Sequence, residues 1–222
     1  MRVVATASIF VCLACSSAPP ADDSTPLPDR DLDRRDSGVT AVPRVDGGGG
    51  SNDAGDGGDD PLVGTDGGVT LRVFAISGTT NARMGGLTGA DAICATHAKK
   101  GGLTGTFVAW LSNKNGPNAV DRLTSNGPWR LATGELVAAT KAELVSGTLQ
   151  HAIDHDESGA LVPASAVWTG TGTNGQYLTN DCDQWTTGND GRVGRTDQTG
   201  AGWTTNGVDD CDSIRKIFCF QK

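Results

Sequence analysis

Thr88-Gly-Ala-Asp-Ala-Ile-Cys-Ala-Thr-His-Ala-Lys-Lys-Gly101 is the stretch that decides the fold of this chain. Its apolar residues recur at helical spacing, and Thr88 with Asp91 makes a capping-box pattern that predicts the start of a helix. The closing Lys-Lys-Gly is typical of a helix end. On this helix we expect Cys94 to face the core and His97 to be a packed or capping group.

Strands are predicted on both sides of this helix. Residues 69–76 alternate and then run apolar, residues 106–111 form a second apolar segment, and residues 214–220 form the last one. A second capping box, Thr140 to Glu143, predicts a short helix. Shorter strand-like segments follow at residues 166–169, 176–178, 182–186 and 202–204. Because the helices come early and irregular β-structure follows, the predicted class is α+β, with few regular elements and long loops.

Four cysteines lie in the same part of the chain, namely Cys94, Cys182, Cys211 and Cys219. An even set of thiols is expected to oxidise outside the cytosol. Four cysteines permit three pairings, and the sequence alone does not choose among them. A bridge from the helix to the last strand, Cys94 to Cys219, would leave Cys182 with Cys211 nested inside it.

The N-terminus predicts export. Residues 1–14 contain one cation, Arg2, and an apolar run that suits a signal peptide but is shorter than the roughly 20 residues that span a bilayer. Leu13-Ala14-Cys15 resembles the lipobox of bacterial lipoproteins, although Cys12 stands where that pattern prefers leucine. We expect lipidation of Cys15 and a stable membrane anchor. The alternative is ordinary cleavage near Ala18.

Residues 15–68 are predicted to be a disordered acidic tether rich in Asp, Gly and Pro, because such a segment buries too little apolar surface to offset its ordering entropy. The 12 Asp and 4 Arg of this segment give a charge of −8, which equals the formal net charge of the whole chain. Residues 69–222 are then expected to form one domain close to neutrality.

Two long stretches carry a resemblance to a known family: Met84-Gly-Gly-Leu-Thr-Gly-Ala-Asp-Ala-Ile-Cys94 and Gly102-Leu-Thr-Gly-Thr-Phe-Val-Ala-Trp-Leu-Ser112. Shorter matches continue in order at residues 121–122, 134–137, 143–147, 167–170, 174–175, 178–179, 182, 185, 191, 211 and 217–219. Residues 73–222 thus resemble endostatin, the collagen-derived C-terminal domain, and the endostatin-like lipoproteins of spirochaetes. The resemblance implies a C-type-lectin-like fold with two nested disulfides, Cys94 to Cys219 and Cys182 to Cys211. It also implies an adhesin-like role toward extracellular-matrix or host serum proteins.

Departures from that family limit the partners and cofactors to expect. The zinc site of endostatin uses an N-terminal histidine cluster, and the matching region here contains no histidine. Its heparin site needs clustered arginines, of which Arg122 is the clearest counterpart. A nearly neutral domain argues against heparin and gives no reason to expect nucleic acid. The Glu-Pro-Asn, Gln-Pro-Asp and Trp-Asn-Asp triplets of calcium-dependent sugar sites do not occur in the sequence.

One acidic segment, Asp154-His-Asp-Glu-Ser-Gly159, is similar to the first half of a calcium loop, which makes Asp154, Asp156 and Glu157 candidate ligands. The twelfth position is Ser165, where such a loop needs a bidentate glutamate. An acidic surface turn or hairpin is therefore the preferred interpretation, and calcium is the alternative. No other cofactor is expected.

Tryptophans are the other candidates for a binding site, because indoles anchor interfaces and stack on sugars. Four of the five lie in strand-like apolar patterns that favour core packing. Trp203, flanked by glycines and threonines in a long loop, is the best candidate for exposure, and Trp185 is the second candidate for ligand contact.

Taken together, these patterns predict an exported binding protein that is lipid-anchored to a bacterial membrane, at the outer membrane, the cell surface or the periplasmic face. Its lectin-like domain is expected to recognise an extracellular protein or glycan through its long-loop face. The alternative is a structural envelope lipoprotein without a soluble ligand. An enzyme is not expected: His155, between two aspartates, could act as a base, but no Gly-x-Ser-x-Gly motif accompanies it. A hydrolase is the third alternative.

Overall fold

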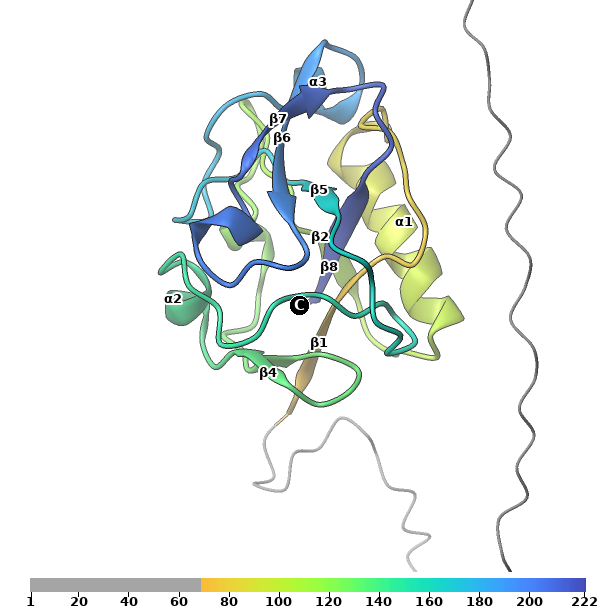
Figure 1. Cartoon of the computed structure of the whole chain (residues 1–222), viewed down its shortest axis with the longest axis vertical. Helices are drawn as coiled ribbons and strands as arrows, with labels where there is room; N and C mark the ends of the chain where they lie inside the picture. Colours follow the sequence, from red (N-terminus) through yellow and green to blue (C-terminus); the bar gives the residue numbers. More distant parts are fainter. Residues whose placement is uncertain (1–68) are drawn as a thin grey trace, which may run out of the picture. The chain divides into compact units, whose positions relative to one another are not determined.

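The computed structural model of the protein describes residues 69–222 (Figure 1). The predicted signal peptide, the lipidation of Cys15 and the acidic tether lie outside the described residues.

The described elements follow one another in a mixed order, with more strands than helices. They are β1 (Leu71–Ala75), α1 (Gly86–Lys100), β2 (Phe107–Ala109), the 3-10 turn η1 (Val120–Arg122), β3 (Trp129–Arg130), β4 (Leu136–Ala138), α2 (Lys141–Leu144), β5 (Ala166–Trp168), α3 (Cys182–Trp185), β6 (Asp190–Arg195), the 3-10 turn η2 (Ala201–Trp203), β7 (Gly207–Asp210) and β8 (Lys216–Gln221). This confirms the α+β class, with short elements and long loops.

The strands form one sheet in the order β4-β3-β1-β8-β5-β6-β7, and β2 also pairs with β8. The last strand is therefore the centre of the sheet. It runs antiparallel to β1 and β2 and parallel to β5. Because β1 and β8 are antiparallel, the start and the end of the domain meet at one end, where the backbone N–H of Arg72 donates to Gln221 Oε1 over 2.9 Å. The loop that carries α3 lies at the opposite end (Figure 1).

The apolar run of β8 is explained by burial on both faces of the sheet. Successive side chains of a strand point to opposite faces, so a strand covered on both sides reads as continuously apolar. Ile217 and Cys219 pack into the core under α1, together with Cys94. Phe218 and Phe220 pack into the second core on the other face. The sequence pattern thus identified the most buried strand of the domain.

The start of α1 differs from the capping-box prediction. The helix begins at Gly86, after Gly85 at φ 81°, and no side chain caps it. A left-handed residue before the helix favours glycine because it has no Cβ. Asp91 instead accepts a hydrogen bond from the Ala109 N–H over 2.9 Å and pairs with Arg122, so it ties the helix to β2. Cys94 is buried, as predicted.

The other predicted elements divide into confirmed and wrong ones. The second capping box is confirmed, since the Glu143 N–H donates to Thr140 Oγ1 at the start of α2. The predicted strand at residues 202–204 is wrong, because residues 201–203 form a 3-10 turn, and residues 176–178 make only a single bridge, Thr171 to Tyr177. Strands β3, β4, β6 and β7 were not predicted. The segment DGRVGR of β6 has no apolar alternation, and β7 pairs with it through GVDD.

The predicted strand at residues 182–186 is wrong in a more informative way. Cys182, Asp183, Gln184 and Trp185 all have positive φ, between 49° and 65°, and form a single left-handed turn. Its hydrogen bonds follow the i to i−4 pattern, with the Trp185 N–H donating to Asp181 O over 2.7 Å. The side-chain pattern gives no sign of this conformation. L-residues usually avoid it, because the left-handed conformation costs about 1–2 kcal/mol per residue.

Candidate functional site

Both disulfides join the cysteines that the family resemblance pairs. Cys94 of α1 is bonded to Cys219 of β8, with 5.5 Å between the Cα atoms. Cys182 is bonded to Cys211, with 5.8 Å between the Cα atoms. The first bond fastens the first helix to the last strand, and the second fastens the left-handed turn α3 to the end of β7. Two disulfides indicate an extracytoplasmic protein.

The expectation that Trp203 is exposed is wrong, and Trp185 is buried as well. The ring of Trp203 lies 5.1 Å from that of Trp110 and 6.0 Å from that of Phe218, in the core under the sheet. The polar neighbours of Trp203 suggested a surface loop, but η2 passes so close to Gly194 that a Cβ there would lie 2.0 Å from Trp203 O. The loop is at the surface while its indole points inward, so neither tryptophan offers a face for ligand stacking.

The three candidate calcium ligands turn away from one another. Asp154 Oδ1 lies 2.7 Å from His155 Nδ1, and Asp156 accepts hydrogen bonds from Ser158 and Ala160 within its own turn. Glu157 is 1% exposed and points to another part of the chain. The segment does form a turn, closed by the antiparallel bridge of His155 with residue 161, but Asp156 and Glu157 are buried rather than on the surface. Within residues 69–222 no three His, Cys, Asp or Glu side chains gather as a metal site.

Glu157 is the centre of a buried polar cluster that joins three segments. Its carboxylate accepts from the Ser77 N–H over 2.8 Å and from Ser77 Oγ over 2.5 Å. His97 Nδ1 lies 2.8 Å away, and Lys100 Nζ lies 3.4 Å away. Burial alone would raise the pKa of Glu157, but the hydrogen bonds from Ser77 and His97 outweigh it and lower the pKa to about 2. The carboxylate therefore stays ionised.

The arrangement of Ser77, His97 and Glu157 differs from a hydrolytic triad. In such a triad the serine donates to one imidazole nitrogen while the acid binds the other. Here the hydroxyl of Ser77 donates to the carboxylate itself, and both groups lie at the same nitrogen, His97 Nδ1, at 3.5 and 2.8 Å. The cluster attaches the loop that carries Glu157 to α1. This contact agrees with the expectation that His97 is a packed group.

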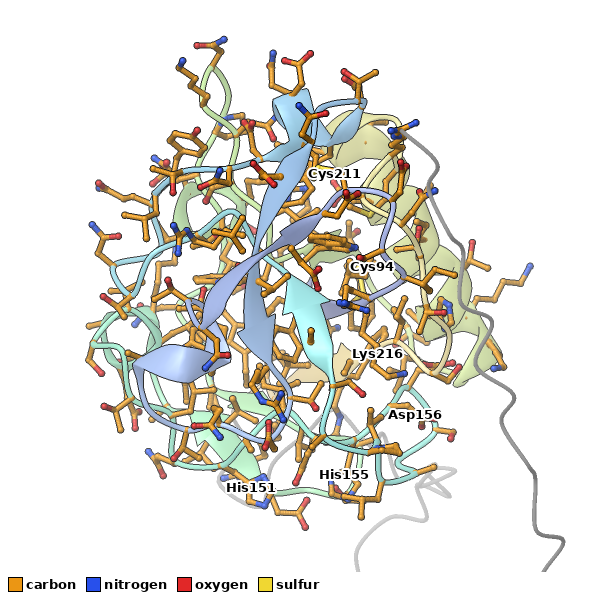
Figure 2. The ribbon with its side chains drawn as sticks, turned by 45° about the horizontal axis from the view of Figure 1, so that its top comes forward. Cys94, His151, His155, Asp156, Cys211 and Lys216 are labelled. Atoms are coloured by element: carbon orange, nitrogen blue, oxygen red, sulfur yellow. A yellow bond between two sulfur atoms is a disulfide. The ribbon has the colours of Figure 1, made fainter. Side chains whose placement is uncertain are left out.

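Lys216 places a positive charge next to residues 76–78, the same segment that Glu157 contacts through Ser77. Its ammonium is buried and donates to three carbonyl oxygens, those of Ile76 at 2.7 Å, Ser77 at 3.1 Å and residue 78 at 3.2 Å. Burial lowers the pKa of Lys216, and the carboxylates of Asp156 and Glu157 partly offset this effect. Figure 2 shows Lys216 beside the loop that carries Asp156.

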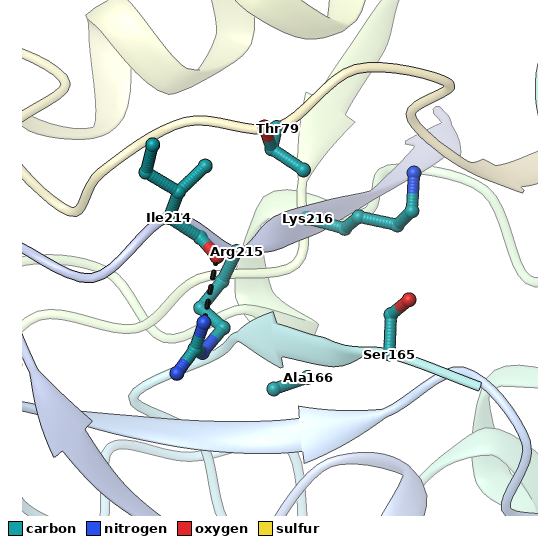
Figure 3. Close-up of a pocket in the computed structure, with 6 residues that line it drawn as sticks. All are labelled: Thr79, Ser165, Ala166, Ile214, Arg215 and Lys216. Carbon is teal, nitrogen blue, oxygen red and sulfur yellow. Dashed lines mark hydrogen bonds between the residues drawn. The ribbon is translucent and has the colours of Figure 1, made fainter. Parts of the chain in front are cut away.

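A cavity of about 210 Å³ opens beside the first residues of β5 and β8 (Figure 3). Its lining residues are Thr79, Ser165, Ala166, Ile214, Arg215 and Lys216. The polar groups around it already have partners: Arg215 donates to Asp209 and to Ile214 O, and Ser165 Oγ donates to Pro163 O. The cavity therefore has a mixed polar and apolar lining, and the donors of Ser165, Arg215 and Lys216 are already used. A second hollow of about 330 Å³ along α1 is lined by Ala92, Ile93, Thr96 and His97.

The most distinctive surface is at the end of the domain that carries α3 (Figure 1). We call it the distal face and define it as residues 113–118, residues 176–187 and Arg192. The backbone N–H of Lys114 donates to Asp181 Oδ2 over 2.8 Å, and that of Tyr177 donates to Asn118 Oδ1 over 2.8 Å. These bonds tie the two loops together, so the distal face is held by specific contacts although it has little regular structure.

The left-handed turn at the distal face is held in place by a buried ring and a disulfide. The ring of Trp185 is buried, and its Nε1–H donates to Ser112 O over 3.1 Å. The neighbouring Cys182 is bonded to Cys211, which closes the turn from the other side. Asp183, between them, is exposed. The turn thus has a fixed base and an exposed edge.

Among residues 69–222, Arg192 has no acidic side chain as an ion-pair partner. One of its Nη atoms donates to Thr205 Oγ1 over 3.2 Å and the other to Thr179 Oγ1 over 2.6 Å. Its Nε is buried and has no partner among the described residues. The charge of Arg192 also acts on Tyr177. The pKa of the Tyr177 hydroxyl is raised, chiefly by burial and then by the charge of Asp181, while the hydrogen bond with the Asn180 backbone and the charge of Arg192 partly offset the rise.

Apart from Trp185, which is buried, the sequence patterns did not single out the residues of the distal face as a site. Tyr177 is the only tyrosine of the chain, and this is the one signal that singled it out beforehand. Arg192 lies in the segment DGRVGR, which lacks the apolar alternation that predicts a strand. Arg122, the predicted counterpart of a heparin-binding arginine, is 8% exposed in its side chain and paired with Asp91, so it is a structural residue.

The profile of the family described as Protein of unknown function (DUF1554) matches residues 77–201. The matched part contains α1, α3 and Arg192 and ends before Cys211 and Cys219. No curated protein matches the chain. None of the helices among residues 69–222 has the length and apolar character needed to cross a bilayer.

Proposed function

The chain belongs to the DUF1554 family of proteins of unknown function, and we propose that it is a membrane-tethered extracytoplasmic binding protein. In this proposal Cys15 carries the lipid anchor, residues 15–68 are the tether, and the distal face of the domain recognises an extracellular protein or glycan. The domain itself is proposed to be endostatin-like, with the C-type-lectin-like fold.

Three features of the domain support this proposed fold. The first helix is bonded to the last strand, and the second disulfide is nested inside the first. The first and last strands pair antiparallel, so both ends of the domain leave from one side. The other side is made by long loops together with the short turn α3. This plan leaves the loops free to serve as a binding surface while the sheet serves as the scaffold.

One observation carries the binding role, namely the left-handed turn of α3. Four consecutive L-residues at positive φ cost about 1–2 kcal/mol each, and such strain persists only where the surroundings fix it. Here the disulfide of Cys182 and the buried ring of Trp185 fix it. Strained, well-supported backbone gathers at ligand-binding sites because it presents groups in a preorganised way. The buried base and exposed edge of this turn fit that role.

The position of the distal face supports the same role. The N-terminal segment joins the domain at residue 69, next to β1 and the end of β8, and the distal face is at the other end of the domain. The distal face therefore lies at the end of the domain away from residue 69, the first described residue. Its edge is also polar and hydroxyl-rich, which suits a wet, specific interface.

An array of glycans and matrix proteins, probed with the full chain, tests the proposal. We expect saturable binding that falls at least tenfold in Tyr177→Ala and in Asp183→Lys, both on the distal face. The matched control is Thr133→Lys in the exposed β3–β4 turn, which should bind like the parent protein. A blank array, or equal loss in Thr133→Lys, would contradict the proposal, and a blank array would favour the structural envelope lipoprotein.

A further inference from the structure

The charge balance of the distal face contains one anomaly. Within residues 69–222, four arginines form ion pairs with aspartates: Arg83, Arg122, Arg195 and Arg215. Arg192 forms none, although it is half-buried and its Nε is wholly covered. Burying a charge without a partner is costly, and buried cations are normally paired. The missing partner is the starting point of the inference.

The guanidinium group of Arg192 is held in a fixed orientation by neighbouring side chains. One Nη atom donates a hydrogen bond to Thr205 Oγ1, and the other donates a hydrogen bond to Thr179 Oγ1. Each Nη atom carries two hydrogens, so each has one left to donate. The bond to Thr179 lies at the exposed side of the group. Because the threonines are neutral, they fix the direction of the guanidinium without cancelling its charge.

Asp181, which bridges to Gly191 next to Arg192, does not supply the missing charge. Asp181 is buried and accepts the Lys114 N–H, and it makes no ion pair with Arg192. The backbone N–H of Arg192 itself is used by Asn180 O over 2.7 Å, which holds the strand against the loop. A counter-ion for Arg192 would come from outside residues 69–222. Guanidinium groups prefer planar carboxylates, which accept two parallel hydrogen bonds.

The surroundings of Arg192 favour a saccharide as the source of the carboxylate. The distal face offers hydroxyl and amide groups, the ring of Tyr177 and the half-exposed Leu178, while the tryptophans that would anchor a protein partner are buried. Sugars combine hydroxyl groups with an apolar ring face, which matches this set. Resting on the proposed function, we propose that Arg192 binds the carboxylate of an acidic saccharide at the distal face.

Calorimetric titration of the full chain with trigalacturonate tests this inference. The methyl ester of the same trimer is the uncharged control, and triglutamate is the peptide arm. We expect trigalacturonate to bind, the ester to bind at least tenfold more weakly, and triglutamate to bind more weakly than the sugar acid. Added salt should weaken the binding of trigalacturonate, because an exposed ion pair is screened.

Matched variants identify the residue. Arg192→Gln should reduce the affinity for trigalacturonate at least tenfold, and Arg192→Lys should reduce it less, because it keeps the charge and loses the fork. Arg195→Gln on the same strand removes an arginine that is already paired with Asp197, so it should bind within twofold of the parent. Circular dichroism of Arg192→Lys confirms that the fold is kept if Arg192→Gln is unstable.

The contrary outcomes are distinct. Absence of trigalacturonate binding, equal binding of the ester, or tighter binding of triglutamate overturns the inference. So does an affinity that both Arg192 variants leave unchanged. An array ligand that Arg192→Gln still binds, but Tyr177→Ala does not, overturns the carboxylate inference and leaves the proposed function standing. Loss of the proposed function itself is recognised separately, by the blank array.

Discussion

At the scale of single residues, Glu157 explains how a loop is attached to the domain. Its ionised carboxylate bonds Ser77 at the end of β1 and His97 in the last turn of α1. A pKa of about 2 in the folded chain and 4.5 in the unfolded chain means that the contribution to stability is complete above pH 4.5. It is lost as the pH falls from 4.5 to 2, and it amounts to about 3 kcal/mol.

We therefore expect Glu157→Gln to unfold more easily than the parent at pH 6 and to lose less stability between pH 4.5 and pH 2. Urea unfolding across this range measures both effects. Asp190→Asn, which removes an exposed carboxyl at the start of β6, is the control and should follow the parent curve closely. If Glu157→Gln keeps the full acid dependence of the parent, the ionised cluster does not hold the loop.

Single residues were also the scale at which prediction from sequence was weakest. Trp203 was expected at the surface because its neighbours are glycine and threonine, and the structure buries it against Trp110. Asp156 and Glu157 were expected at the surface because they are acidic, and both are buried with hydrogen-bond partners. Sequence neighbours report the polarity of a segment, whereas the direction of one side chain in an irregular loop depends on contacts distant in the chain.

At the scale of elements, the sequence predicts the strands that are buried on both faces and the helices that are clearly amphipathic. The apolar runs of β1, β2 and β8 were visible because each strand packs against a core on both sides. α2 was visible through its capping box. β6 and β7 were invisible, because they consist of glycines, charges and few apolar residues and are held by pairing with each other. The pairing of β6 with β5 places both strands in the sheet.

The glycine at the start of β6 gives a prediction at this scale. A Cβ on Gly191 would lie 2.6 Å from Cys182 Sγ and 2.6 Å from the ring of Trp168, both of which are buried. Neither can move away freely, because one is in a disulfide and the other in the core. We expect Gly191→Ala to lower the free energy of unfolding by roughly 1–3 kcal/mol, the usual cost of overpacking a core.

Gly200→Ala is the matched control for that experiment. A Cβ at Gly200 meets nothing within 4 Å, and its backbone is extended. We expect it to be neutral or slightly stabilising, because alanine restricts the unfolded chain. Thermal unfolding followed by circular dichroism compares the two variants with the parent. Equal stability of Gly191→Ala and Gly200→Ala would mean that the packing beneath α3 is looser than described.

At the scale of the whole molecule, the two disulfides differ in the chain they close. Cys94 and Cys219 are separated by 125 residues in sequence, and Cys182 and Cys211 by 29. In the chain-entropy account, removing the first costs about 5 kcal/mol and removing the second roughly 3–4 kcal/mol. We expect the double variant Cys94→Ala/Cys219→Ala to be the less stable of the two in urea. The reverse order would contradict the chain-entropy account, in which the longer closed loop contributes more.

The inner disulfide has a further consequence for the distal face. Without it, the left-handed turn of α3 loses one of its two supports and should relax, since each of its residues gains about 1–2 kcal/mol by leaving positive φ. In Cys182→Ala/Cys211→Ala we expect faster amide exchange in residues 182–187, while α1 stays protected. Unchanged protection of residues 182–187 would show that the ring of Trp185 holds the turn alone.

The central claim is that the distal face, rather than the end where the tether joins, is the binding surface. Amide exchange of the full chain, with and without the strongest ligand from the array, tests it most directly. The account predicts new protection in residues 113–118 and 176–187 and unchanged exchange in the β3–β4 turn. Protection of the β3–β4 turn, with residues 176–187 exchanging as before, would contradict it.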